Sequence, residues 1–292
     1  MTAALALFLA ILIWASNSIM VKVVLREVTP LTLTWLRFLL AALFYLPFAA
    51  ATWRRSPGYT SREWVLLVGA GVALVPVFSL TLYWALTYTS VANTALVRMT
   101  EPAWVLLLGA VLLGERATRR QMAGLALALV GTTALALLGR QPSVSGDHHM
   151  LGMAFMIANS IAWVAYILCF KNLLLRHRVT QVTVHAALAG SAVLFLVTGP
   201  THAAGVAREA AAMSPFAWSL VVAMALIVTI GSNQLFSYGL QRVPAGSAAA
   251  YSYLTPVVAA GLAWLVLGEP VTIVVVVCGM VIAIGVYLLN RA

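Results

Sequence analysis

The chain has 292 residues, of which 63% are hydrophobic and 8% are charged, and its formal net charge is +10. A soluble domain carries roughly 25% charged residues, so this composition excludes a soluble globular protein. Glycine and proline, at 20 and 11 residues, are near ordinary usage, which excludes fibrous and low-complexity chains. A polytopic membrane protein remains, because each membrane-spanning helix needs about 20 mostly apolar residues.

Ten apolar segments follow one another along the chain, separated by short polar or glycine- and proline-containing stretches. None of them alternates with a period of two, so we expect helices and not the strands of a membrane barrel. The expected spans are residues 3–24, 30–52, 64–87, 91–113, 119–138, 149–170, 180–199, 215–238, 246–267 and 271–289.

The loops between these spans share the basic residues unequally. The side that holds the N-terminus receives 11 lysines and arginines, and the opposite side receives 4. The positive-inside rule then places both termini in the cytoplasm. The excess of basic residues is therefore explained by the orientation of the chain in a lipid bilayer, and we expect no nucleic-acid partner. The expected bilayer is the bacterial inner (plasma) membrane.

One motif occurs twice at the same distance from a proline. Glu115 lies 13 positions after Pro102, Glu269 lies 13 positions after Pro256, and each glutamate ends a Leu-Gly-Glu sequence. The two copies are 154 positions apart. This match predicts that the chain consists of two related halves.

The halves are expected at residues 1–140 and 141–292, with five spans in each. Because five is an odd number, the second half must cross the membrane in the opposite sense to the first. Inverted repeats are typical of secondary transporters, whose substrate site lies near the bilayer midplane. The predicted fold class is therefore an all-α membrane protein with ten transmembrane helices, built as two inverted five-helix repeats.

These motifs resemble those of the drug/metabolite transporter superfamily, in particular its ten-helix EamA-type branch. The residues that carry the resemblance are Trp84-Ala85-Leu86-Thr87-Tyr88-Thr89-Ser90, Glu101-Pro102, Leu113-Gly114-Glu115-Arg116, Tyr238-Gly239-Leu240, Thr255-Pro256 and Leu267-Gly268-Glu269. The resemblance implies a central cavity between helices 1–4 and 6–9, with helices 5 and 10 outside it. Small multidrug members use a glutamate in their first helix. This chain has Trp14 and Asn17 there instead, which argues against proton-driven antiport of cationic drugs.

Polar and aromatic residues share faces of the first and sixth spans. Trp14 and Asn17 are three positions apart, and Asn159 and Trp163 are four apart, so each pair lies on one helical face. We expect them to bind substrate, with aromatic walls and amides that orient a polar ligand. The alternative is helix packing, with each asparagine bonded to a neighbouring helix.

The third and eighth spans offer a second set. Ser79 and Tyr83 share one face of the third span, and Asn233 and Phe236 share one face of the eighth. Aromatic rings and neutral amides suit an amphipathic or zwitterionic solute, and they suit a phosphate sugar poorly. Interhelical hydrogen bonding is again the alternative.

Prolines interrupt the fourth and ninth spans. Pro102 and Pro256 are expected to kink their helices and to act as hinges, while a kink that only shapes packing is the alternative. Met99 and Tyr253 each lie three residues before a proline, so with Tyr251 they are further candidates for substrate binding.

Three charged residues fall well within spans, away from the span ends. Arg98 and Glu101 are three positions apart, so we expect an intramembrane ion pair, either structural or part of a gate or proton-coupling site. Arg37 is ambiguous: it could bond carbonyl groups or pair with a carboxylate of another helix.

The predicted function is a secondary transporter that exports amino acids, aromatic or large hydrophobic ones, by alternating access. The alternative is broad efflux of hydrophobic drugs or other small metabolites. Enzymatic motifs are absent from the sequence, so we expect no catalytic residues, no cofactor and no metal. Small-residue pairs on helices 5 and 10, Gly124/Ala128 and Gly279/Ala283, allow close packing within the bundle or a homodimer.

Overall fold

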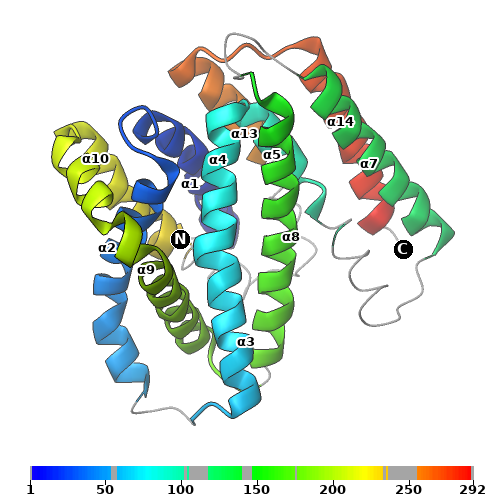
Figure 1. Ribbon diagram of the computed structural model, residues 1–292. Helices are drawn as coiled ribbons and strands as arrows, with labels where there is room; N and C mark the ends of the chain where they lie inside the picture. Colours follow the sequence, from blue (N-terminus) through cyan, green and yellow to red (C-terminus); the bar gives the residue numbers. More distant parts are fainter. Residues whose placement is uncertain are drawn as a thin grey trace. The chain divides into compact units, whose positions relative to one another are not determined.

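In the computed structural model, the described residues are 2–53, 58–101, 104, 118–139, 147–174, 176–232, 235 and 255–290. Every regular element among them is helical (Figure 1), which confirms the all-α class for this part of the chain. The elements are α1 (Ala3–Val24), α2 (Pro30–Trp53), α3 (Ser61–Val72), η1 (Ala73–Phe78), α4 (Ser79–Tyr88), α5 (Val91–Arg98), α7 (Arg119–Leu138), α8 (His149–Leu174), α9 (Val179–Ala212), α10 (Pro215–Ala223), η2 (Met224–Gly231), α13 (Thr255–Leu262), η3 (Ala263–Leu267) and α14 (Ile273–Asn290).

Five helices of the described residues are long and apolar enough to cross a membrane. They are Leu5–Val24, Pro30–Ala50, Ser61–Tyr88, His149–Tyr166 and Thr180–Ala212. Four shorter apolar helices occur at Met122–Leu138, Pro215–Gly231, Val258–Leu267 and Ile273–Gly285. A chain with this many apolar helices is a multi-pass membrane protein.

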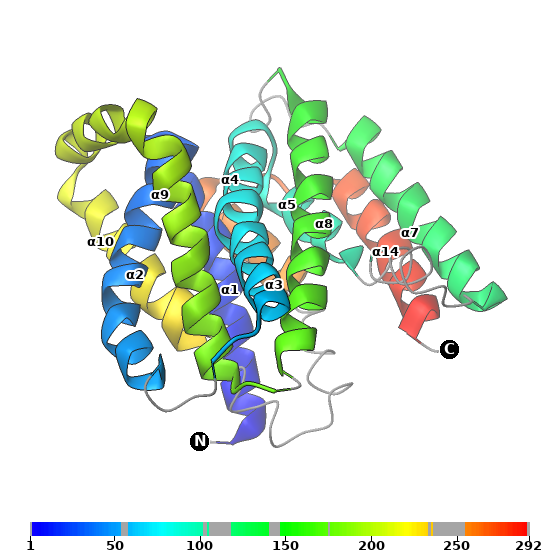
Figure 2. The same cartoon turned by 60° about the horizontal axis from the view of Figure 1, so that its bottom comes forward.

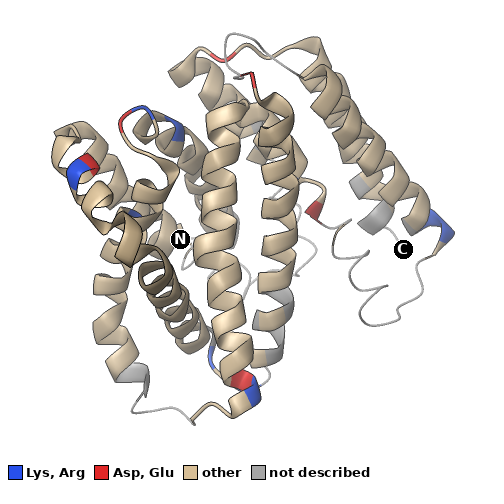
Figure 3. Cartoon of the chain, viewed as in Figure 1, with Lys and Arg blue, Asp and Glu red and all other residues tan. Residues whose placement is uncertain are grey.

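Charged side chains mark the ends of the helices. Lys22 lies in the last turn of α1, Glu63 in the first turn of α3, and Arg119 at the start of α7. Figure 3 shows the same preference for helix ends along most of the described chain. Arg37 departs from this preference, because it lies seven residues after the start of α2.

The chain divides into two compact units, and each unit draws on both halves of the sequence. Unit 1 contains residues 1–19, 84–161 and 232–292, and unit 2 contains residues 20–83 and 162–231.

In unit 1, α7 and α14 lie side by side in both views (Figure 1, Figure 2). A Cβ atom at Gly285 would lie 2.6 Å from the backbone nitrogen of Ala128 and 2.8 Å from the carbonyl oxygen of Gly124. The small residues Gly124 and Ala128 therefore serve packing within the chain, against Gly285. Gly279 instead faces Leu96, and a homodimer through these helices stays a prediction.

In unit 2, α9 packs against both α2 and α3. The contact with α3 is close because two glycines meet: a Cβ atom at Gly71 would lie 2.7 Å from the backbone nitrogen of Gly190. Phe38, Val75 and Leu194 form part of the buried core next to this contact.

Helix α9 is longer than the sequence predicted. We expected a break at Gly199-Pro200, but the helix continues through both residues to Ala212. A proline inside a helix removes one backbone hydrogen bond, yet its fixed φ is compatible with helical geometry. The prediction of a turn at this point was wrong, because the Gly-Pro pair, although typical of turns, lies here within one continuous helix.

Polar contacts join the loops at the two ends of unit 2. At one end, Glu27 accepts hydrogen bonds from the backbone nitrogen and hydroxyl of Ser214, at 2.7 and 2.8 Å. Glu209 accepts one from the backbone nitrogen of Thr29 at 2.7 Å. At the other end, Arg176 Nη1 lies 3.4 Å from Glu63 Oε1.

Candidate functional site

A buried arginine is the central feature of unit 2. The Arg37 residue is only 9% exposed. Its Nη1 donates to the Tyr83 hydroxyl at 2.7 Å, and its Nε and Nη2 both donate to Oγ1 of Thr229 at 3.2 Å. A charged side chain inside a membrane span is costly, and such groups mark functional sites. Both of these partners are neutral hydroxyls.

Two irregular helical segments shape the surroundings of Arg37. The π-helical segment η1 ends directly before Ser79. The π-helical segment η2 contains Thr229. The Ser79 hydroxyl donates to the carbonyl of Leu74 at 3.3 Å, and the Thr229 hydroxyl donates to that of Met224 at 3.0 Å. Each hydroxyl thus satisfies a carbonyl five residues earlier, where the wider turn has shifted the backbone bonding. Such segments occur often at functional sites.

An aromatic cluster lies on the neighbouring segments. Trp163 of α8 lies between Phe78 and Tyr166, with ring centroids 5.3 Å away in both cases. Phe78 directly precedes Ser79, so the structure brings Trp163 next to the predicted site segment of the third span.

Tyr45 bonds the same threonine as Arg37. Its hydroxyl donates to the carbonyl of Thr229 at 3.4 Å, and Arg37 donates to the hydroxyl of the same residue. The arginine and the aromatic rings both lie in unit 2, and Tyr83, which bonds Arg37, follows Phe78 by five residues along one continuous helical stretch. We call Arg37, Tyr45, Phe78, Tyr83, Trp163, Tyr166 and Thr229 the Arg37 site.

Four further predicted residues lie in unit 1. The Trp14 Nε1 donates to the hydroxyl of Ser232 at 2.7 Å, a residue that was not among the predicted site residues. Asn17 and Asn159 are buried, at 7% and 0% exposure. Met99 follows the last residue of α5 and is half-buried. A wall formed jointly by Trp14 and Trp163 stays a prediction, because the two residues belong to different units.

The charged pair of the fourth span also lies in unit 1. Arg98 ends α5, and its Nε is 3.5 Å from Oε1 of Glu101. Both side chains are partly exposed, at 29% and 21%.

Pro256 is the second residue of α13. The predicted residues Pro102, Asn233, Phe236, Tyr251 and Tyr253 lie outside the described residues.

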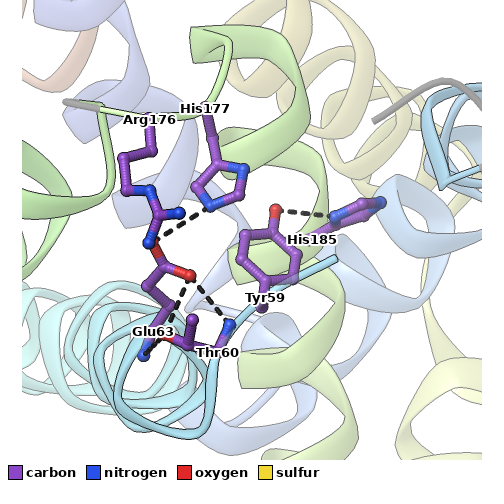
Figure 4. A network of polar contacts seen from close by, with 6 residues as sticks. All are labelled: Tyr59, Thr60, Glu63, Arg176, His177 and His185. Carbon is purple, nitrogen blue, oxygen red and sulfur yellow. Dashed lines mark hydrogen bonds and ion pairs between the residues drawn. The ribbon is translucent and has the colours of Figure 1, made fainter. Parts of the chain in front are cut away.

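A second polar cluster occurs at the end of unit 2 where α3 begins (Figure 4). Thr60 caps α3, and the Glu63 carboxylate accepts a hydrogen bond from the Thr60 backbone nitrogen at 2.8 Å. The same carboxylate lies 3.4 Å from Nε2 of His177, whose side chain is 2% exposed.

Tyr59 completes this cluster. Its ring packs 4.5 Å from the ring of His177, and its hydroxyl is 2.9 Å from Nδ1 of His185 (Figure 4). Burial raises the pKa of the Tyr59 hydroxyl to about 12, so the group stays protonated at physiological pH. The cluster ties the start of α3 to the connection between α8 and α9.

Sequence reasoning missed part of the Arg37 site. Tyr45 and Thr229 were not singled out, and Arg37 was left without an assigned partner. The available signal was a lone arginine within an apolar span, which asks for polar partners on other helices. Spacing along one helix cannot identify those partners, since Thr229 is 192 positions from Arg37.

Comparison with known proteins supports a transporter. The family model described as the EamA-like transporter family matches residues 1–137 and 150–291. The chain is 28% identical over 288 residues to an uncharacterized transporter of Archaeoglobus fulgidus, covering 97% of this chain and 96% of that protein.

Two further relatives have more specific names. One is a probable terminal-alkyne amino-acid exporter of Streptantibioticus cattleyicolor, 27% identical, with 98% of this chain and 92% of that protein covered. The other is a probable amino-acid metabolite efflux pump of Escherichia coli, 27% identical, with 96% and 92% covered. A solved crystal structure matches the fold with a TM-score of 0.60 at 22% identity, covering 99% of this chain and 96% of its own.

Proposed function

The chain belongs to the EamA-like transporter family, and from that premise we propose that it exports amino acids, aromatic or large hydrophobic ones, by alternating access. Family membership makes it a transporter, in agreement with the expectation that it is not an enzyme. The observation that carries the substrate class is the aromatic cluster around Trp163, with Phe78 and Tyr166 at 5.3 Å on either side. The names of the relatives as amino-acid exporters and efflux pumps agree with this class. We further propose that its function is similar to that of the aromatic amino acid exporter YddG, which its motifs resemble.

The proposed architecture has ten transmembrane helices in two inverted repeats, residues 1–140 and 141–292, around a central cavity. Both termini face the cytoplasm, and the membrane is the bacterial inner membrane. The family model matches the chain twice, once in each half. A shift of 154 positions also carries η1, residues 73–78, onto residues 227–232, which overlap η2. The same departure from α-helical geometry in both halves is what a structural repeat predicts.

In this proposal, aromatic residues contact the apolar part of the substrate and polar residues orient the rest. The aromatic and apolar group contains Trp14, Tyr83, Met99, Trp163, Phe236, Tyr251 and Tyr253, and the polar group contains Asn17, Ser79, Asn159 and Asn233. Pro102 and Pro256 allow the fourth and ninth helices to bend, and the Arg98–Glu101 pair lies on the fourth. Alternating access requires such bends if the halves rock about a fixed site.

Counterflow in liposomes tests this function. Purified protein is reconstituted with unlabelled tryptophan inside, and entry of radiolabelled tryptophan is measured against phenylalanine, alanine, a sugar and a lipophilic cation. Saturable exchange that only aromatic and large aliphatic amino acids inhibit is the expected result. Inhibition by the lipophilic cation and other unrelated apolar compounds would instead favour broad efflux.

Two tryptophan variants locate the site. Trp163→Ala removes the middle ring of the aromatic cluster and should lower tryptophan counterflow about tenfold, since stacked aromatic contacts contribute about 1 kcal/mol or more. Trp264→Ala is the matched control, because Trp264 is 60% exposed on the surface of η3. Equal rates in both variants, at equal membrane expression, would contradict the assignment of Trp163.

A further inference from the structure

We propose that Glu63 and His177 form a proton-dependent contact that holds the start of α3 to the connection between α8 and α9. When the imidazole ring of His177 carries a positive charge, it pairs with the Glu63 carboxylate. When the ring is neutral, the contact is weaker. The proposal describes how the conformation of this end of unit 2 responds to pH, and it does not depend on which solute the protein transports.

The first argument is the position of the His177 ring. Its side chain is 2% exposed, and its Nε2 atom lies 3.4 Å from Oε1 of Glu63 (Figure 4). Within the part of the chain that the structure describes, neither ring nitrogen has a partner in hydrogen-bonding geometry. A buried polar group without such a partner costs free energy, so the ring gains from a stronger interaction with the carboxylate beside it. Histidine is the side chain whose charge ordinarily changes between pH 5 and 8.

The second argument is that the Glu63 carboxylate is held in place. Its Oε2 accepts hydrogen bonds from the backbone nitrogen and the hydroxyl of Thr60, at 2.8 and 2.9 Å. Hydrogen bonds of this kind favour the ionised form of a carboxylate. A buried ion pair is favourable only where its remaining polar atoms are satisfied, and Thr60 satisfies the oxygen that does not face His177.

The arginines near His177 alter this balance little. Arg176 Nη1 lies 3.4 Å from the same Glu63 oxygen, but its side chain is 68% exposed, and Arg178 is also exposed. Water and salt screen the interactions of exposed charges. The contact between His177 and Glu63 is shielded from water, so a charge on the ring interacts more strongly with the carboxylate than with either arginine.

Two further titratable side chains belong to this cluster. The Tyr59 ring centroid lies 4.5 Å from that of His177, and the Tyr59 hydroxyl lies 2.9 Å from Nδ1 of His185 (Figure 4). Burial raises the pKa of Tyr59 to about 12, so this residue stays neutral over the pH range in which histidine titrates. His185 is a second histidine, and only a dependence on Glu63 distinguishes His177 from it.

The contact acts on a helical stretch that carries residues of the Arg37 site. The stretch that begins with α3 continues through η1 and α4 to Tyr88 and includes Phe78 and Tyr83. It is also fixed to α9 where Gly71 meets Gly190. Protonation of His177 therefore holds the first turn of this stretch more firmly.

The sign of the pH effect follows from the two charges. The ion pair exists only while the ring of His177 is protonated and Glu63 is ionised. Its contribution is present where histidine is charged and is lost as the pH rises through the range in which histidine releases its proton. The start of α3 should therefore be held more firmly at pH 6 than at pH 8.

A double-mutant cycle at two pH values tests the proposal. Melting temperatures of the purified full chain in detergent are measured at pH 6 and pH 8 for wild type, His177→Gln, Glu63→Gln and the double variant. Glutamine at position 63 preserves a capping box and removes the charge. The coupling between the two substitutions should be about 2 °C or more at pH 6 and less than half of that at pH 8. Equal coupling at the two pH values, or none at pH 6, would overturn the proposal.

Two control cycles use other cationic side chains of unit 2. His202→Gln makes the same change at an exposed histidine, and it should show no coupling with Glu63→Gln at either pH. Arg176→Gln removes a partner of Glu63 that stays charged at both pH values, so its coupling with Glu63→Gln should not change with pH. A coupling that changes with pH in either control would contradict the assignment to His177.

Hydrogen exchange keeps the proposal testable if His177→Gln does not fold. Amide exchange of residues 61–66 is compared at pH 6 and pH 8 in wild type and Glu63→Gln, with each rate divided by the intrinsic rate at that pH. On this scale the wild type should exchange at least about threefold more slowly at pH 6, and Glu63→Gln should lose most of the difference. The same difference in both proteins would overturn the proposal, because it would show that the response to pH does not need the charge of Glu63.

Discussion

Glu269 accepts a hydrogen bond from the backbone nitrogen of Val91 at 2.9 Å, although the two residues are 178 positions apart. Val91 is the first residue of α5, so the carboxylate of the second Leu-Gly-Glu sequence caps the start of a helix in the first half of the chain. Its glycine, Gly268, has a φ of 68° and ends η3, a conformation that favours glycine. The carboxylate of Glu269 therefore joins the segment after η3 to the start of α5 within unit 1.

Loss of this carboxylate should destabilise unit 1. Glu269 is 3% exposed, and removing it leaves a backbone donor at a helix N-terminus without its acceptor. We expect Glu269→Ala to lower the free energy of unfolding by about 1 kcal/mol or more. Glu269→Gln keeps an acceptor oxygen and should lose less. Apparent melting temperatures in detergent test this, and identical values for the alanine variant and wild type would rule out the capping role.

Alanine substitutions at two glycines of unit 2 should change the stability of the protein in opposite directions. A Cβ atom at Gly71 would meet the backbone of Gly190 at 2.7 Å, so Gly71→Ala must push α3 away from α9 and should cost about 3 kcal/mol. A Cβ atom at Gly205 of α9 meets nothing within 4 Å, so Gly205→Ala should stabilise the helix by up to about 1 kcal/mol. Thermal unfolding of the two variants side by side checks both signs. A neutral Gly71→Ala would mean that the two helices do not approach as described.

The contact of Glu27 with Ser214 should depend on pH. The hydrogen bond from the Ser214 backbone nitrogen, and then that from its hydroxyl, lower the pKa of Glu27 in the folded protein. A lowered folded-state pKa means that the contact stabilises the fold above the ordinary pKa of glutamate. This stabilisation disappears as the pH falls through the folded-state value.

Glu27→Gln should therefore lower the melting temperature at neutral pH, and the difference from wild type should shrink as the medium is acidified. Arg26→Gln, at the exposed neighbouring position, is the control and should show no such trend. A difference between Glu27→Gln and wild type that stays constant with pH would contradict an ionised Glu27 as the source.

The cap of α3 should be sensitive to one hydroxyl. The Thr60 side chain accepts from the backbone nitrogen of Glu63 at 3.3 Å, and Glu63 bonds back to the Thr60 backbone nitrogen, which forms a capping box. Thr60→Ala should cost about 1 kcal/mol and speed hydrogen exchange in the first turn of α3. Thr60→Ser keeps the hydroxyl and should behave like wild type. Equal exchange in all three proteins would argue against the capping box.

Much of the fold could be predicted because apolar spans are a local property. A membrane helix must be apolar over its own length, so the sequence alone located helices such as α1 and α2 within a few residues. It also indicated an unusual residue at Arg37, because a single charge within an apolar span is visible without a structure. The break expected at Gly199-Pro200 failed because helix continuity prevailed over a turn signal.

Which residues meet was decided only by tertiary structure. The bonds of Arg37 to Tyr83 and Thr229, of Trp14 to Ser232 and of Glu269 to Val91 join residues 46 to 218 positions apart. Apolarity and helical period specify which face of each helix is polar. Which residues that polar face contacts depends on which helices pack against each other. Close packing in turn depends on pairs such as Gly71 and Gly190, which belong to different helices. The sequence by itself therefore determined the class of protein and its candidate polar groups. Helix packing determined the Arg37 site, because it sets the distances across which those groups bond.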